Sequence, residues 1–259
     1  MIYDVYVQFD YRMDRPTDII LQIQAPSSEG QTVLAESVDF SPLAFSNTVD
    51  AEAGIGTRML LRTTGDLTCH YRARVDVTRT AHDIETLHAD PLHRLPAQAV
   101  RCLMPSRYCN PDEVQGLVGD RFDSLQGGAR IVAIRDWISE NFEYVSGAST
   151  VQTTAVQTAT SRQGVCRDFA HVLIALARDC GIPARYVSVY SAGVLPQDFH
   201  AVAEVYLAGA WHLVDATGMA RADQIIQIGV GLDAAEVSFL SSFGAVTCMS
   251  QTVNVVAAL

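Results

Sequence analysis

Apolar and polar residues alternate along much of the first 80 residues of the chain. Between Leu67 and Val77 every second side chain is apolar, and polar or charged residues fill the positions between. This period of two predicts a strand with one buried face. Met1 to Tyr11 and Ile19 to Ala25 show the same period, and Thr64-Gly65-Asp66 predicts a hairpin turn. Short strands separated by turns predict an antiparallel β-sandwich over residues 1–80, in which residues 41–56 are the least patterned part.

The alternation fades between residues 81 and 100. His82, His88 and His93 lie here among acidic residues and prolines. A metal-binding tract is one interpretation, but no strand or helix period directs these rings towards one point. We therefore interpret residues 81–100 as a linker between two domains, with solvated histidines.

From residue 101 onwards the apolar positions follow a helical period. Ile131, Ile134, Ile138 and Phe142 form a stripe that predicts a helix over 128–142. The strongest pattern predicts a helix over 165–180 that ends at Gly181. The further elements that the pattern predicts are a short helix over 112–118, strands over 185–190, 201–207 and 211–214, and more β structure at 225–228 and 245–256. These elements predict a second domain over residues 101–259 and an α+β protein as a whole.

Composition and charge narrow the classes of function. The 259 residues carry 18 basic and 29 acidic side chains, a formal net charge of −11, which argues against non-specific binding to nucleic acid or to an anionic membrane surface. No apolar run is long enough to span a membrane, and the first residues lack a signal-peptide pattern. We therefore expect a cytoplasmic protein, in which the six cysteines are free thiols rather than disulfides. The pattern does not predict an oligomeric state.

The candidate chemistry begins at Cys166, where a loop turns into the helix predicted over 165–180. The positive end of a helix dipole stabilises a thiolate, the nucleophilic form of cysteine. His200 begins one predicted strand and Asp215 ends the next, and a hairpin between them would make the two residues neighbours. Cysteine, histidine and aspartate in this arrangement predict a catalytic triad for acyl transfer through a thioester, which requires no cofactor and no metal.

The other polar residues have alternative interpretations. His171 lies about 140° round the helix from Cys166, so we predict a structural hydrogen bond for it rather than a role as the base. Glu204 is interpreted as an ion-pair partner of Arg185 or Arg167. A zinc site made from the triad residues is a less favoured alternative. The backbone N–H of Cys166 is the first candidate for stabilising an oxyanion, and Tyr144, Gln152 and Trp211 are candidates for the second donor. Residues 146–163 are predicted to form a long polar loop that lines the site.

These motifs resemble the transglutaminase-like superfamily of cysteine hydrolases and acyltransferases, and within it the bacterial members similar to cysteine proteases that carry an N-terminal β-domain. The resemblance rests on the runs Gly164 to His171 and Gly181 to Val187, on His200-Ala201, and on Trp211 with Asp215-Ala216-Thr217. It implies a papain-like core, in which a catalytic helix packs on an antiparallel sheet, and it gives the catalytic roles to Cys166, His200 and Asp215. The chain departs from the family pattern at Val202, where the family usually has tryptophan.

We therefore expect a thiol hydrolase or acyltransferase that cleaves an amide, peptide or isopeptide bond in a peptide or protein substrate. Hydrolysis is favoured because water is the default acceptor. The alternatives are a transamidating enzyme that cross-links proteins, a catalytically silent binding module with the same fold, and, less favoured, a metal-dependent hydrolase.

Overall fold

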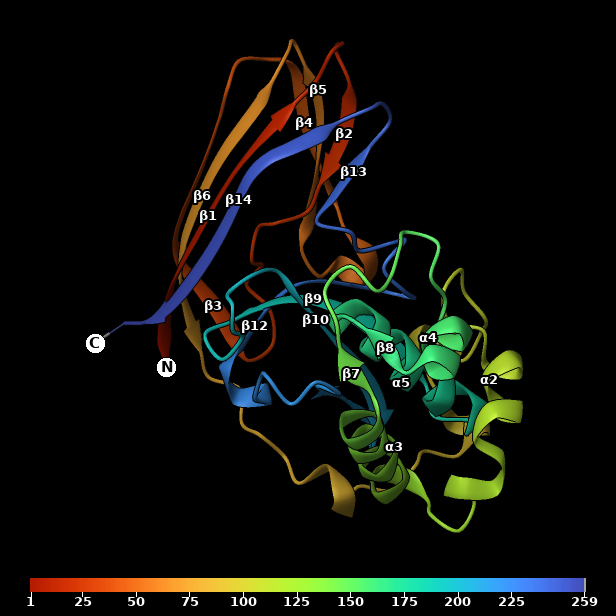
Figure 1. Cartoon of the computed structure of the whole chain (residues 1–259). Helices are drawn as coiled ribbons and strands as arrows, with labels where there is room; N and C mark the ends of the chain where they lie inside the picture. Colours follow the sequence, from red (N-terminus) through yellow and green to blue (C-terminus); the bar gives the residue numbers. More distant parts are fainter. Residues whose placement is uncertain (259) are drawn as a thin grey trace.

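Strands from both ends of the chain build one β-sandwich. The computed structural model describes residues 1–258, and its fold is α+β, as predicted (Figure 1). One sheet has the strand order β14-β1-β6-β3, and the other has the order β13-β2-β5-β4. Their bounds are β1 Ile2–Arg12, β2 Asp18–Leu21, β3 Gln31–Phe40, β4 Leu43–Asp50, β5 Thr57–Thr63, β6 Leu67–Val77, β13 Leu240–Ser242 and β14 Thr247–Ala257. The apolar sides of both sheets meet in a core that contains Phe9, Leu61 and Tyr71.

The end of the chain lies in the sandwich and not in the second domain, where the sequence had placed all of residues 101–259. β14 pairs antiparallel with β1, and β13 pairs with β2. The local pattern identified β structure at 245–256 but carries no information about its partner strand. The unpatterned residues 41–56 contain β4, whose side chains are almost all exposed. Without a buried face, a strand shows no alternation in its sequence.

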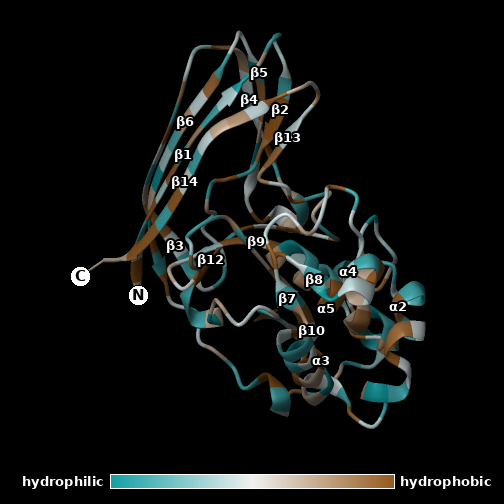
Figure 2. Cartoon of the chain, viewed as in Figure 1, coloured by the Kyte–Doolittle hydropathy of each residue, from teal (hydrophilic) through white to brown (hydrophobic). Residues whose placement is uncertain are grey.

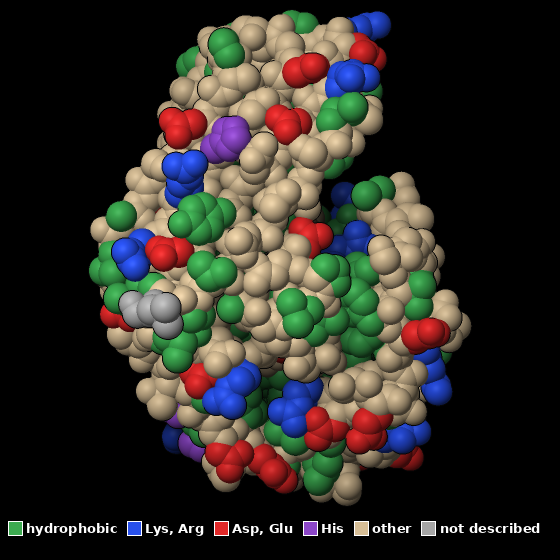
Figure 3. All heavy atoms as spheres, turned by 60° about the vertical axis from the view of Figure 1, so that its left-hand side comes forward, with side chains coloured by type: hydrophobic (Ala, Val, Ile, Leu, Met, Phe, Trp, Pro, Cys, Tyr) green, Lys and Arg blue, Asp and Glu red, His purple; other side chains and the backbone are tan. Residues whose placement is uncertain are grey.

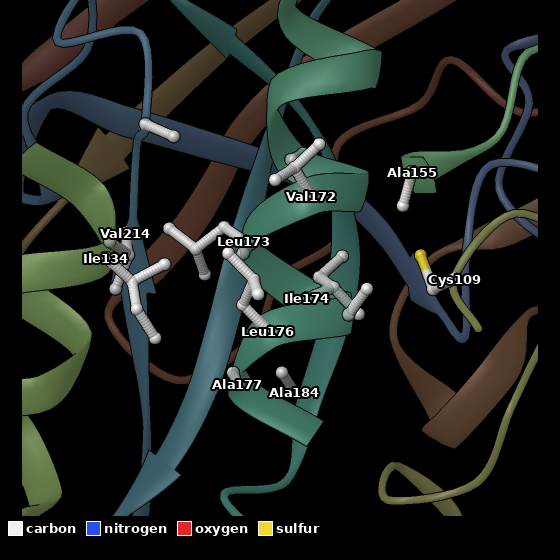
Figure 4. Packing of buried hydrophobic residues seen from close by; sticks show 14 of the residues in the cluster. Cys109, Ile134, Ala155, Val172, Leu173, Ile174, Leu176, Ala177, Ala184 and Val214 are labelled. Atoms are coloured by element: carbon white, nitrogen blue, oxygen red, sulfur yellow. The ribbon is translucent and has the colours of Figure 1, made fainter. Parts of the chain in front are cut away.

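The second part of the molecule is built on the antiparallel sheet β11-β10-β9-β12. Its strands are β9 Ala184–Ser191, β10 His200–Leu207, β11 Ala210–Val214 and β12 Ile225–Gly231. Helix α5, Cys166–Asp179, packs on one face of this sheet through Val172, Leu173 and Leu176 (Figure 4). This arrangement agrees with the catalytic helix on an antiparallel sheet that the motifs implied.

Further helices surround α5. They are α1 Ala97–Arg101, α2 Pro111–Val118, α3 Gly127–Asn141 and α4 Ala155–Ser161, and there are single-turn helices at Glu52–Gly54, Ile84–Thr86, Leu92–Arg94, Gly119–Phe122 and Ala222–Gln224. Helix α4 lies within residues 146–163, which were predicted to be loop throughout. Thr154 begins it with a capping box, in which its side chain accepts from Gln157 N and the Gln157 side chain accepts from Thr154 N. A capping box uses polar side chains, so it can occur in a polar sequence such as this one. The helix itself is too short to show an apolar period.

The segment 81–100 contacts the second part through Ile84 and Leu87. The N–H of Gly128 donates to the carbonyl of Leu87, 2.8 Å away, and a Cβ atom on Gly128 would overlap the carbonyl of Ile84. The absence of a side chain at Gly128 therefore lets this segment lie directly on α3. Within residues 1–258 no three His, Cys, Asp or Glu side chains gather as a metal site, and no helix is long and apolar enough to cross a membrane.

The two parts share packed side chains. Tyr190 of β9 and Ile226 and Ile228 of β12 belong to the core of the sandwich, and the Tyr190 hydroxyl donates to the carbonyl of Ile23 at 2.7 Å. Hydrophobic and hydrophilic residues alternate along the strands of the sandwich in Figure 2. The surface is hollowed between the two parts on the side shown in Figure 3, where charged side chains of both signs are visible.

Candidate active site

Cys166 is the first residue of α5 and is partly exposed. The helix starts there because the side chain of Asp168 turns back and accepts the N–H of Val165 at 2.9 Å. A carboxylate in the first turn of a helix also interacts favourably with the helix dipole. Gly164 allows this turn, since a Cβ atom there would lie 2.7 Å from Cβ of Asp168.

Asp168 and Arg167 connect the start of α5 to the loop before α4. Asp168 is fully buried, and its Oδ1 accepts from Nε and Nη2 of Arg167 at 3.0 and 2.7 Å. Nη2 of Arg167 also donates to the Ser149 hydroxyl and to the carbonyl of Thr150. Arg167 was one of the two partners predicted for Glu204, but its partner is Asp168. Their mutual contact fixes the position of Cys166 relative to the loop.

His200 and Asp215 meet at the edge of the sheet, where β10 begins and β11 ends. The strand register places Val214 opposite Ala203, which brings Asp215 near His200. Nε2 of His200 lies 3.0 Å from Oδ2 of Asp215, and both side chains are buried. The hairpin anticipated from the sequence therefore brings these two residues into direct contact.

Asp215 is held by four hydrogen-bond donors. Oδ1 accepts from the backbone N–H and the hydroxyl of Thr217, at 2.8 and 2.7 Å, and Oδ2 accepts from Ala220 N at 2.8 Å as well as from His200. Burial alone would raise the pKa of Asp215, but the hydrogen bonds from His200 and Thr217 outweigh it and lower the pKa below its ordinary value. Asp215 is therefore an ionised carboxylate with a fixed orientation.

Cys166 lies close enough to His200 for its thiol to affect the pKa of the ring. Burial lowers the pKa of His200, but its hydrogen bond to Asp215 and its contact with the Cys166 sulfur outweigh burial and raise the pKa to about 10. Nδ1 is buried and has no hydrogen-bond partner among residues 1–258. His200 is therefore in direct contact with Asp215 and close to Cys166. The three side chains are not among any group of His, Cys, Asp or Glu in residues 1–258 that could hold a metal ion.

The three candidates for the second oxyanion donor lie in different places. Tyr144 ends the short strand β7 (Glu143–Tyr144), which runs parallel to β8 (Gln163–Gly164) just before Cys166. Burial raises the pKa of Tyr144 to about 12, and contact of its hydroxyl with the Cys166 thiol contributes. Gln152 is exposed, and its side-chain oxygen accepts from the Thr150 hydroxyl. Only Tyr144 of the three lies against Cys166.

Trp211 lies on the sheet face opposite α5. Its ring stacks over the guanidinium of Arg185, with Cζ 4.1 Å from the ring centroid. Val202, where the family pattern usually has tryptophan, is buried on this same rear face with Val187 and Leu213. Neither side chain lies in the hydrophobic cluster that contains Cys166.

Two polar side chains outside the triad have structural partners. The ring of His171 is buried, accepts the N–H of Ala234 at 3.2 Å, and stacks on Tyr108. Its predicted structural hydrogen bond is thus present. Glu204 pairs with Arg185, one of its two predicted partners, at 2.7 Å.

Comparisons with known proteins relate the chain to the transglutaminase-like family that its motifs resemble. A family model described as the transglutaminase-like superfamily matches residues 118–216. The chain is also similar to the crystal structure of a "putative cysteine protease" from Cytophaga hutchinsonii, with 33% sequence identity and a TM-score of 0.91. That similarity covers 99% of this chain and 90% of the other, so it includes the sandwich.

The similarity to curated relatives covers a smaller part of this chain. An uncharacterized protein of Mycobacterium leprae is 27% identical over 145 residues, and an uncharacterized protein of Mycobacterium tuberculosis is 40% identical over 65 residues. The chain spans about half the length of the first (52%) and about a fifth of the second (21%).

Proposed function

The chain belongs to the transglutaminase-like superfamily, and from this membership we propose that it is a thiol hydrolase that cleaves an amide bond of a peptide or protein. The observation that carries the proposal is the direct contact of His200 with the Asp215 carboxylate, with Cys166 at the start of α5 close to the same ring. A histidine in this position takes the thiol proton, and a carboxylate holds its ring in the required tautomer.

The reaction proceeds in two steps. The Cys166 sulfur attacks the carbonyl carbon, the C–N bond breaks, and His200 delivers the proton to the leaving amine, which leaves a thioester. Water then attacks the thioester carbonyl and gives one proton to His200. The C–S bond breaks, a carboxylic acid is released, and His200 returns the proton to the Cys166 sulfur. Asp215 stays ionised throughout and stabilises the imidazolium form of His200.

The developing oxyanion requires hydrogen-bond donors close to the sulfur. The backbone N–H of Cys166, in the first turn of α5, is one donor, and the hydroxyl of Tyr144 is the second. The contact of Tyr144 with Cys166 favours it over Gln152 and Trp211, whose contacts lie elsewhere. Loss of one oxyanion donor lowers kcat by about 10²- to 10³-fold in a well-studied enzyme, so we expect a loss of this order in Tyr144→Phe.

Thiol labelling tests the nucleophile without a known substrate. We expect iodoacetamide at near-neutral pH to alkylate Cys166 faster than Cys248, which is more exposed but lies on β14 of the sandwich, opposite Tyr11. His200→Ala should slow the labelling of Cys166 and leave that of Cys248 unchanged. Equal rates at the two cysteines of the native protein would count against an activated thiol and would support a silent binding module.

A library of fluorogenic peptide amides tests the reaction itself. Release of the fluorophore by the native protein, lost in Cys166→Ala, is the expected result. If a fluorescent primary amine added to the reaction is incorporated into the peptide, the enzyme transfers the acyl group to amines. In that case transamidation, and not hydrolysis, is the reaction.

A further inference from the structure

A cavity of about 690 Å³ lies on the rear face of the sheet β11-β10-β9-β12. On β10, Ala203 and Val205 face α5, whereas Glu204 between them lines this cavity. Residues 28–30 and 78–80 of the sandwich form part of its wall, and none of the three triad residues does. The volume is that of a typical small-molecule site.

The floor of the cavity carries a buried polar network. Nε of Arg185 pairs with Oε2 of Glu204 at 2.7 Å, and the two side chains are 8% and 6% exposed. Oε1 of Glu204 accepts from Nε2 of Gln227 at 2.6 Å, and Oε1 of Gln227 accepts from Nη2 of Arg79 at 3.3 Å. Nη1 of Arg79 donates to the carbonyl of Ile225. Both oxygens of Glu204 are therefore occupied, and so is the guanidinium of Arg79.

Two groups on the cavity wall have hydrogen-bond donors without acceptors. Nη1 and Nη2 of Arg185 donate to no acceptor among residues 1–258, where the only hydrogen bond of this side chain is made by Nε. Nε1 of Trp211, whose ring lies over this guanidinium, is buried and has no acceptor either. Donors without acceptors in a largely buried site are unfavourable, so a ligand that supplies acceptors here would be stabilised.

The charges favour a single negative charge on the ligand. The buried and half-buried ionised groups are Arg79, Arg185 and Glu204, which sum to +1 (two positive, one negative). Burial lowers the pKa of His212, so this ring adds no charge at neutral pH. Glu29 and His82 are exposed at the rim, where solvent screens any charge.

We propose that this rear cavity, defined by Arg79, Arg185, Glu204, Trp211 and Gln227, binds a small organic monocarboxylate. The carboxylate accepts from the free edge of the Arg185 guanidinium, whose planar fork matches the two carboxylate oxygens. The apolar part of the ligand lies against the Trp211 ring. The inference does not depend on the proposed function, because no triad residue takes part in the site.

Fluorescence of Trp211 tests the proposal. The chain has two tryptophans, so Trp137→Phe leaves Trp211 as the only reporter. Benzoate is the probe and benzamide, which has the same shape without the charge, is its control. We expect a saturable change in emission with benzoate and at least tenfold weaker binding of benzamide. Equal binding of the two compounds, or no saturable change at millimolar benzoate, would overturn the proposal.

Two variants locate the binding. Arg185→Lys keeps a positive charge beside Glu204 but removes the fork, and it should weaken benzoate binding at least tenfold, whereas Arg62→Lys on the exposed face of β5 should not. If Arg185→Lys does not fold, Trp211→Phe measured by calorimetry replaces it and should also bind more weakly. Alkylation of Cys166 beforehand should leave benzoate binding unchanged. Loss of binding after alkylation, or unchanged binding in the folded variant, would refute the rear site.

Discussion

Nε2 of His200 lies 3.0 Å from Oδ2 of Asp215, and the two side chains are almost completely shielded from solvent. This contact leaves Nδ1 as the ring nitrogen available to the Cys166 thiol. Since the carboxylate is held by Thr217 and Ala220 as well, the ring has one orientation. The contact therefore decides both the tautomer of His200 and its position.

Asp215→Asn should remove most of the activity. The amide nitrogen takes the place of one carboxylate oxygen. At the position of Oδ2 it would face His200 and Ala220 N–H as a second donor, so that His200 is driven to the tautomer protonated on Nδ1 and cannot accept the thiol proton. At the position of Oδ1 it would face the two donors of Thr217, and the side chain would no longer carry the charge that stabilises the imidazolium. The same change in a serine protease costs about 10⁴-fold in kcat, and we expect a loss of this order in peptide-amide cleavage. Asp223→Asn, at an exposed ion pair nearby, is the control and should keep full activity. Similar rates in the two variants would argue against Asp215 as the orienting acid.

His200 should make the free energy of unfolding fall as the pH rises from 6.5 to about 10. Its pKa is raised from 6.5 to about 10 in the folded protein, so its protonated form stabilises the fold fully below pH 6.5. This contribution is lost as the pH rises through about 10. We expect the difference in unfolding free energy between the native protein and His200→Gln, measured by urea denaturation, to shrink over this window. A difference that stays constant across the window would contradict the raised pKa.

His171 should make the free energy of unfolding fall as the pH is lowered from 6.5 to about 3. Burial lowers its pKa from 6.5 to about 3, so between these values the unfolded chain binds a proton that the folded protein excludes. Stability therefore falls as the pH is lowered through this range. His171→Phe should lose roughly 1–3 kcal/mol at neutral pH, because Ala234 N–H loses its acceptor. Its deficit should narrow at pH values well below 6.5, whereas the exposed control His93→Gln should show no such narrowing.

Asp168 should be essential for the position of Cys166. Asp168→Ala leaves the Arg167 guanidinium without its buried partner and Val165 N–H without an acceptor. Breaking a buried pair costs about 3–5 kcal/mol, and we expect a loss near the lower end, since Arg167 is partly exposed. Labelling of Cys166 should slow as well. Asp179→Ala, at the far end of the same helix, tests whether any change to α5 has this effect, and we expect normal labelling there.

Elements with at least one buried face were predictable from the sequence, and elements without one were not. The strand at Leu67–Val77 has the bounds that its alternation predicted, and α5 begins within one residue of its predicted start. Strand β4 is exposed along its length and gave no pattern, and α4 is shorter than two full apolar repeats. The period of apolar residues shows which side of an element is buried. It therefore predicts secondary structure only where an element has a buried side.

The partners of elements were harder to predict than the elements themselves. β structure at residues 245–256 was predicted, but its place beside β1 follows from a pairing across the whole chain. Likewise, the sequence offered Tyr144, Gln152 and Trp211 as equal candidates beside Cys166. The strand pair β7–β8 places Tyr144 there, and the alternation of β11 places Trp211 on the opposite face.

The sequence by itself determined the candidates for the chemistry: a cysteine at a helix start, a histidine at the start of a strand and an aspartate after the next one. These assignments rest on short-range patterns and motifs, which the order of residues contains directly. The tertiary structure decided how those residues are held, through Asp168 and Arg167 at the helix and through Thr217 and Ala220 around Asp215. It alone also revealed the donors left over at Arg185 and Trp211, because hydrogen-bond satisfaction depends on contacts between segments distant in the sequence.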